Sequence, residues 1–184
     1  MTESNSDGDI IRACQKGSDD AFTQLVGRYQ DKAFWVGYNL LGNTEEARDV
    51  AQEAFLKAYA ALPRFRQDAQ LSTWFYRILV NQASKYRRKR WVRDRYDSLV
   101  GHTPGRTAGS VSQAEGDPGL RRRIAMAIDR LPPGQRVAFA LVHLEGLSVP
   151  EAAEVMQRAA GTVKSHLHRA TQALRQELED VMEP

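Results

Sequence analysis

The chain has 184 residues, of which 42% are hydrophobic and 27% charged, and this is the composition of an ordinary globular protein. This length allows one medium domain or two small ones. The single cysteine, Cys14, excludes an internal disulfide and a cysteine metal cluster. Apolar runs are all shorter than the roughly 20 residues of a membrane-spanning helix. The start of the sequence is polar and acidic, unlike a signal peptide, so we expect a cytoplasmic protein.

Helical spacing of apolar residues dominates the first part of the chain. After residue 18, apolar side chains recur at every third or fourth position, as one buried helix face requires. A second helix is predicted to be capped by Asn43 or Thr44 and to end near Leu62, before Pro63. The positions predicted to be buried in these two helices are Phe22, Leu25, Val26, Tyr29, Ala33, Val36, Leu40, Ala47, Val50, Ala51, Ala54, Phe55, Ala58 and Tyr59.

A third helix is predicted to follow a polar loop that contains one aromatic residue, Phe65. One of its sides is predicted to face the core. A different side mixes an aromatic with amide and cationic groups. The core side contains Phe75, Ile78, Leu79 and Tyr86, and the mixed side contains Trp74, Arg77, Asn81, Lys85 and Arg88.

The same helix continues into a strongly basic stretch from Ser84 to Arg95. Its sequence, "SKYRRKRWVRDR", holds seven Lys or Arg side chains and one acid, Asp94, whereas the whole chain has a formal net charge of only +3. The positive charge is therefore localised. Localised charge of this kind is typical of binding to nucleic acid or to an anionic membrane, although a merely solvated face is the alternative. Trp91 and Val92 give only a small apolar face, which speaks against the membrane.

Residues 97–119 contain five glycines, two prolines and few large apolar side chains, and they predict a flexible linker. Helical spacing then resumes. The expected buried positions are Ile124, Ala127, Ile128, Leu131, Val163, Leu167, Ala170, Leu174 and Leu178. A short helix starting at a Ser148–Glu151 capping box, a tight connection and a helix with small polar and basic residues at its start suggest a helix-turn-helix. Periodicity alone leaves an ordinary helical hairpin equally open.

Two stretches of the sequence resemble known protein regions. The segments "LPPGQR", "LEGLS" and "GTVKSHLHRA" resemble the C-terminal DNA-binding region of sigma factors of the extracytoplasmic-function group. The segments "DVAQEAFLKAYAALPRFR" and "STWFYRILVNQASKYRRKR" resemble the promoter-melting region of the same group. The resemblance implies an all-α chain with two helical domains, at residues 1–96 and 120–184, joined by the flexible linker at 97–119.

This resemblance implies three binding surfaces and no cofactor or metal. The first domain would dock on a coiled coil of the largest subunit of core RNA polymerase through Asp49, Gln52, Glu53 and Lys57. It would also hold the melted minus-10 strand of promoter DNA through Phe65, Trp74, Arg77, Asn81, Lys85 and Arg88, with the loop of residues 63–72 receiving a flipped base. The second domain would bind the minus-35 duplex through Arg136, Arg158, Thr162, Lys164, Ser165, His168 and Arg169. An anti-sigma factor is the further expected partner.

Several of these assignments have plain structural alternatives. Phe65 and Trp74 could belong to the core, and the outer face of the second helix could simply be solvated. The chain also departs from the family, which usually has a turn glycine, an apolar residue and a serine where this sequence has Gln157, Arg158 and Ala159. The turn before the recognition helix could therefore differ from the turn usual in the family, and Arg158 could add a contact to a DNA phosphate.

Other function classes fit less well. His166 and His168 are two residues apart on a predicted helix and so point in different directions, which makes a poor metal pair. Phosphate-binding glycine loops are absent from the sequence, and Cys14 lacks a cationic setting, so we expect no enzyme. The runner-up is a LuxR-type transcriptional regulator, because "GTVKSHL" resembles that helix-turn-helix also. The stretches "DVAQEAFLKAY" and "WFYRILVNQ" speak against it.

Overall fold

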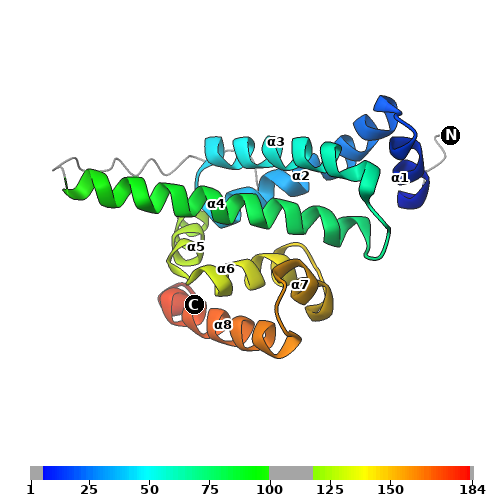
Figure 1. Ribbon diagram of the computed structural model, residues 1–184. Coiled ribbons are helices and arrows are strands. Elements are labelled where there is room, and N and C mark those ends of the chain that lie inside the picture. Colours follow the sequence, from blue (N-terminus) through cyan, green and yellow to red (C-terminus); the bar gives the residue numbers. More distant parts are fainter. Residues whose placement is uncertain (1–5, 100–117, 183–184) are drawn as a thin grey trace.

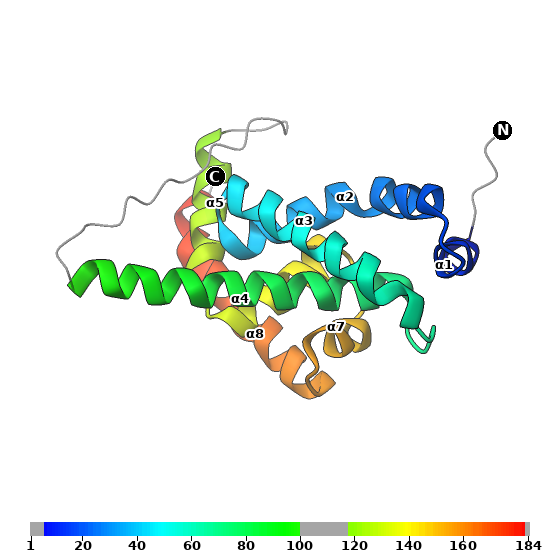
Figure 2. The same ribbon diagram turned by 45° about the horizontal axis from the view of Figure 1, so that its top comes forward.

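The computed structural model describes residues 6–99 and 118–182, and every regular element in these two ranges is helical. The all-α prediction is confirmed. Most of the predicted linker, residues 100–117, lies outside the described residues. Its ends are helical, because the fourth helix runs to Leu99 and the fifth begins at Pro118. The structure has two helical units, and they pack against each other (Figures 1 and 2).

The N-terminal unit is built from four α-helices and a short 3₁₀ turn. These elements are α1 (Asp7–Gln15), α2 (Asp19–Leu41), α3 (Thr44–Ala61), η1 (Leu62–Arg64) and α4 (Leu71–Leu99). Helices α2, α3 and α4 pack on one another, and α1 packs against α2 and η1 (Figure 1). Most residues of the predicted stripes are buried or half-buried, but Tyr59 is 52% exposed. Its ring packs edge-on against Phe22, and its hydroxyl donates to Asp19.

The turn between α2 and α3 is defined by two adjacent residues. Gly42 ends α2 in the left-handed conformation, with φ of 68°, which a glycine adopts without steric cost. Asn43, rather than Thr44, caps α3, since its side-chain oxygen accepts the Glu46 N–H at 2.9 Å. At the other end, α3 stops at Ala61, one residue before the predicted end, and continues into η1.

The C-terminal unit is a smaller helical bundle. Its elements are α5 (Pro118–Arg130), α6 (Pro133–Phe139), the π-helical turn η2 (Ala140–Leu144), α7 (Val149–Met156) and α8 (Ala160–Met182). Helix α8 packs against α5, α6 and α7. Leu131, Ala170 and Leu174 are buried between α5 and α8, as predicted, whereas Ile124 is 37% exposed in the middle of α5.

The two units share one continuous apolar core. Helix α7 lies along α4, and α5, α6 and η2 contact α2 (Figures 1 and 2). Leu79 and Val80 of α4 belong to the same buried cluster as Leu141 and Ala152 of the C-terminal unit. This packing explains why α4 is buried on more sides than its sequence predicted. The additional buried residues of α4 include Tyr76, Val80 and Ala83.

Candidate nucleic-acid interface

A groove between α3 and α4, lined mainly by polar and charged residues, brings together several of the predicted strand-binding residues. Asn81, Lys85 and Arg88 are exposed on one stripe of α4 and line this groove, whose volume is about 510 Å³. Lys57 of α3, which was predicted to contact polymerase, lines the same groove. Arg77 is half-buried one turn earlier on the stripe. The groove therefore combines cations for phosphates with amide groups for base edges.

The two aromatic residues predicted to stack on bases are buried instead. Phe65 is 6% exposed and Trp74 is 8% exposed, and their ring centroids lie 4.7 Å apart. The structure thus supports the alternative that both belong to the core. In this conformation neither ring has a free face for a base, so the exposed groups of the loop and of α4 are the ones that can meet a strand.

The basic stretch of α4 has two roles, divided between its two sides. Arg87 donates to the carbonyl of Leu40 at 3.2 Å, and Arg90 donates to the carbonyl of Leu41 at 3.1 Å. Both carbonyls belong to the C-terminal end of α2, where cations are favourable. Burial is the main cause that lowers the pKa of Arg87. The remaining cations of the stretch, which are exposed, are Lys85, Arg88, Lys89, Arg93 and Arg95.

Helices α7 and α8 form the helix-turn-helix that the sequence suggested. The capping box is present, because Glu151 accepts the Ser148 N–H at 2.8 Å while Ser148 caps the first turn of α7. The hydrogen bonds from Ser148 lower the pKa of Glu151. Gln157 ends α7 in the left-handed conformation, with φ of 52° and ψ of 48°. The left-handed turn thus forms here without a glycine.

Six of the seven predicted minus-35 residues are exposed on one surface. They lie in the turn and on the first two and a half turns of α8, opposite the buried Val163 and Ala170. These exposed residues are Arg158, Thr162, Lys164, Ser165, His168 and Arg169. Their cations, hydroxyls and imidazole can serve phosphates and base edges of a duplex.

The seventh residue, Arg136, is buried, which corrects the prediction that it binds DNA. Its side chain is 1% exposed, and its guanidinium pairs with Asp129 at 2.6 Å. It also donates to the carbonyls of Leu131 at 3.0 Å and of Leu40 at 3.2 Å, the latter across the contact between the units. Burial is the main cause that lowers its pKa to about 10. Arg136 precedes the buried Ala140 by four residues, a helical spacing that could have placed it on the inner face.

The contact between the units contains a second hydrogen bond that the sequence did not suggest. The Tyr76 hydroxyl of α4 donates to the carboxylate of Glu145, which follows η2, at 3.0 Å. Burial is the largest cause that raises the pKa of both groups. Nothing in the spacing of either residue indicates this contact, because the two are 69 positions apart.

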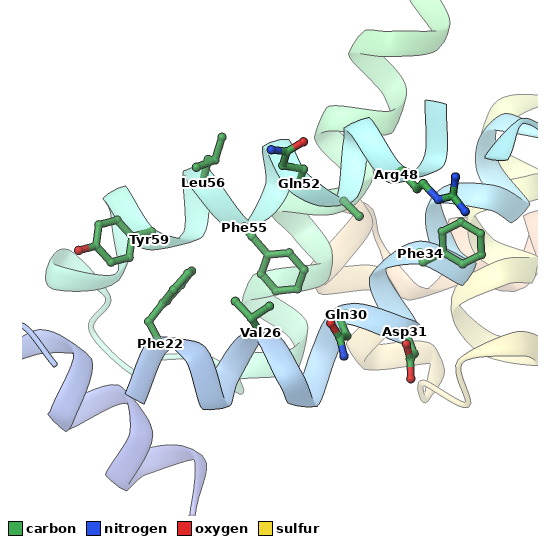
Figure 3. Close-up of a pocket in the computed structure, with 11 residues that line it drawn as sticks. Phe22, Val26, Gln30, Asp31, Phe34, Arg48, Gln52, Phe55, Leu56 and Tyr59 are labelled. Atoms are coloured by element: carbon green, nitrogen blue, oxygen red, sulfur yellow. The ribbon is translucent and has the colours of Figure 1, made fainter. Parts of the chain in front are cut away.

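The outer face of α3 presents the predicted polymerase-docking residues. Asp49, Gln52 and Glu53 are exposed, and Lys57 is half-buried with its ammonium 3.2 Å from Glu53. Beside them lies an apolar groove of about 500 Å³ between α2 and α3 (Figure 3). Gln52 and the 61% exposed Leu56 line this groove from α3. The other apolar residues that line it include Phe22, Val26, Phe55 and Tyr59.

Within residues 6–99 and 118–182, metal binding and membrane insertion find no structural support. The His, Cys, Asp and Glu side chains of these ranges form no group of three or more that could hold a metal ion. Likewise, none of the helices found there is both long enough and apolar enough to cross a membrane.

Two family models match the chain in the order of its two units. The model "Sigma-70 region 2" matches residues 25–93, and the model "Sigma-70, region 4" matches residues 121–174. The chain belongs to the sigma-70 family. It is therefore an RNA polymerase sigma factor, and the first match covers α3 and most of α4 while the second covers the helix-turn-helix.

Curated relatives place this sigma factor in the extracytoplasmic-function group. It is 36% identical to the ECF RNA polymerase sigma factor SigW of Bacillus subtilis, with 93% of this chain and 96% of the relative covered. It is 35% identical to the ECF RNA polymerase sigma-E factor of Escherichia coli K12, with 95% of each covered. Sigma factors of this group bind core RNA polymerase and promoter DNA, and this chain is accordingly a transcription initiation factor.

Solved structures share the fold over nearly the whole length. The sigma factor RpoE of Bartonella quintana, solved with the anti-sigma factor NepR, has a TM-score of 0.73 at 25% identity. That comparison covers 89% of this chain and 98% of the other. CnrH, solved with the cytosolic domain of CnrY, has a TM-score of 0.71 at 24% identity, covering 93% and 96%.

Proposed function

We propose that this sigma factor divides its contacts among three exposed surfaces. The outer face of α3 binds core polymerase, the groove between α3 and α4 holds the minus-10 strand, and α8 reads the minus-35 duplex. The observation that carries the proposal is that at least half of the predicted residues of each surface are exposed together. Phe65, Trp74 and Arg136 are buried, Arg77 and Lys57 are half-buried, and Lys57 lines the groove of the minus-10 surface. The proposed domain boundaries are residues 1–96, 97–119 and 120–184, although α4 extends to Leu99 and α5 begins at Pro118, both inside the predicted linker.

The polymerase surface combines a polar rim with an apolar groove. Asp49, Gln52 and Glu53 provide hydrogen bonds and charge, and the groove beside Gln52 accepts apolar side chains from a polymerase helix (Figure 3). Exposed Leu56 and Tyr59 favour this occupant, because large apolar groups at the rim of a groove gain free energy when a partner covers them.

The minus-10 surface works by charge and hydrogen bonding. Lys57, Lys85 and Arg88 neutralise strand phosphates, while Asn81 reaches base edges. The exposed cations further along α4 follow the duplex upstream of the opened segment. Since each neutralised phosphate releases counterions, the affinity for DNA falls steeply with salt concentration.

The two units must separate before both promoter elements can be bound at once. Positions −10 and −35 are about 25 base pairs apart, or about 85 Å along B-form DNA. The C-terminal unit packs against α2 and α4, and α4, the longest of the helices described, has 29 residues and is about 43 Å long. The chain between Leu99 and Pro118 can extend to about 60 Å, which permits the separation.

Regulation by an anti-sigma factor is part of the proposal. The similar RpoE was solved with the anti-sigma factor NepR, and a binding partner of that kind would act on this chain by covering its polymerase or DNA surfaces. The site of action is the cytoplasm, where core polymerase is found. The chain positions DNA and polymerase and performs no catalysis itself.

Run-off transcription tests this function directly. Purified protein with core polymerase should start transcription at discrete sites in a genomic promoter library, and core polymerase alone should not. Folded protein that binds duplex fragments but gives no specific transcript would instead support the LuxR-type regulator, which needs no polymerase-docking helix.

A further inference from the structure

The last residue of α1, Gln15, reaches the turn that follows α3. Its side-chain amide donates to the carbonyl of Phe65 at 2.8 Å and to the carbonyl of Leu62 at 3.3 Å. These partners lie 50 and 47 positions away in the sequence, so one side chain connects two distant segments. Helix α1 lies beside η1, as Figure 1 shows.

The segment held by Gln15 is the start of the loop that joins α3 to α4. In this loop, Phe65 points inward onto Trp74, while Arg64, Arg66 and Gln70 are exposed. Gln67 has φ of 57°, a conformation that non-glycine residues rarely adopt. A loop with a strained residue needs contacts elsewhere to keep it in one conformation.

From these contacts we infer that Gln15 is a positioning residue for the minus-10 strand. It fixes the backbone at the first residue of η1 and at the residue that follows η1, so that the exposed loop groups and the start of α4 hold one arrangement before DNA arrives. A prearranged loop loses less conformational entropy when it binds a strand. The inference rests on the proposed minus-10 function of this loop.

The amide suits this task because both partners are acceptors. An amide nitrogen carries two hydrogens and can donate to two carbonyls, whereas a carboxylate has none to give. Gln15→Ala removes both hydrogen bonds, and Gln15→Glu replaces them with repulsion between oxygens. The exposed Gln24 of α2 offers matched controls, Gln24→Ala and Gln24→Glu, which make the same changes away from the loop.

The first measurement is affinity for a single-stranded minus-10 oligonucleotide, determined for the complex with core polymerase. Gln15→Ala should bind about fivefold more weakly than wild type, as expected for losing two modest hydrogen bonds from a prearranged site, and Gln15→Glu should bind at least as weakly as Gln15→Ala. Binding of the minus-35 duplex should be unchanged, and both Gln24 variants should match wild type. Equal strand affinity for Gln15→Ala and Gln24→Ala would overturn the inference.

The second measurement follows the loop itself without DNA. In a Trp35→Phe/Trp91→Phe background, Trp74 is the only tryptophan left of three. Gln15→Ala should shift its emission to longer wavelength, because a released loop exposes the Trp74 ring. It should also speed trypsin cleavage after the exposed Arg64 and Arg66, because a released backbone fits a protease site more readily. Unchanged emission and cleavage would show that Gln15 does not hold the loop. If wild type itself fails to bind the strand, the proposed minus-10 function fails instead, whatever the loop probes show.

Discussion

At the scale of single residues, Arg136 shows how a buried cation differs from an exposed one. Its guanidinium is surrounded by Asp129 and by the carbonyls of Leu40 and Leu131, and the low exposure leaves no room for water to replace a lost partner. A lysine carries the same charge but cannot reproduce the planar set of donors.

We therefore expect Arg136→Lys to lower the free energy of unfolding by about 3 kcal/mol, as for other broken buried pairs. The matched change in an exposed cation, Arg169→Lys, should alter it by no more than about 0.5 kcal/mol. Urea unfolding followed by circular dichroism measures both. Equal stability of the two variants would mean that the Arg136 contacts contribute nothing.

Two glutamates should respond to pH in opposite directions. Burial raises the pKa of Glu145 above 4.5, so the folded chain holds a proton there more readily than the unfolded chain. This group's contribution to stability is therefore present at low pH and declines as the pH rises through its folded pKa. Hydrogen bonds from Ser148 lower the pKa of Glu151, whose contribution is present above 4.5 and lost on acidification.

Urea unfolding at pH 3, pH 5 and pH 7 separates the two cases. Glu145→Gln keeps an acceptor for Tyr76 and removes the ionisation, so its stability relative to wild type should improve between pH 5 and pH 7. Glu151→Gln should become less stable relative to wild type between pH 3 and pH 5, where the contribution of the Glu151 carboxylate is gained. Parallel trends in the two variants would show that burial at Glu145 does not outweigh its hydrogen bond.

At the scale of helices and turns, the spacing of apolar residues predicted the positions of the helices better than the residues of the binding sites. Helix positions followed from apolar residues three or four apart, because that spacing is set by the helix itself. The outcome for Phe65, Trp74 and Arg136 depended on what packs over each face, and spacing along one helix does not carry that information. The additional buried face of α4 has the same origin, since the second unit covers it.

The turn before α8 gives a prediction at this scale. Gln157 has φ of 52°, where a side chain costs about 1 kcal/mol and glycine costs little. Gln157→Gly should therefore raise the free energy of unfolding by about 0.5–1 kcal/mol. Gln176→Gly, a matched change inside α8, should lower it by about 1 kcal/mol. If both changes destabilise the chain, the left-handed turn is not a source of strain.

The two sides of α4 predict different effects of removing a cation. Lys85 and Arg88 are exposed in the groove, so Lys85→Gln or Arg88→Gln should each reduce the salt dependence of strand binding by about 0.7 in the logarithmic slope. Arg87 is half-buried and bonded to the carbonyl of Leu40. Arg87→Gln should lower stability and leave the slope unchanged. Affinities measured over a range of salt concentrations decide this, and an equal loss of slope in all three would contradict the division.

At the scale of the whole molecule, the packed arrangement of the two units was not predictable from the sequence. The composition of residues 97–119 predicts only a flexible linker between the units. The contact between the two units depends on their shapes and on polar pairs such as Tyr76 with Glu145. Packing on a helix about 43 Å long conflicts with promoter elements about 85 Å apart. From the proposed division of contacts we therefore expect the free and promoter-bound forms to differ in the distance between the units.

Energy transfer between two dyes measures that distance. In a Cys14→Ser background, exposed Gln24 and Arg175 can be changed to cysteine and labelled, one on each unit. Transfer should be efficient in the free chain and should fall when core polymerase and promoter DNA are added. A second pair within the N-terminal unit, at Gln24 and Ala60, should not change. Unchanged transfer across the units in a complex that transcribes from the promoter would show that the closed form binds both elements, and the distance argument would be wrong.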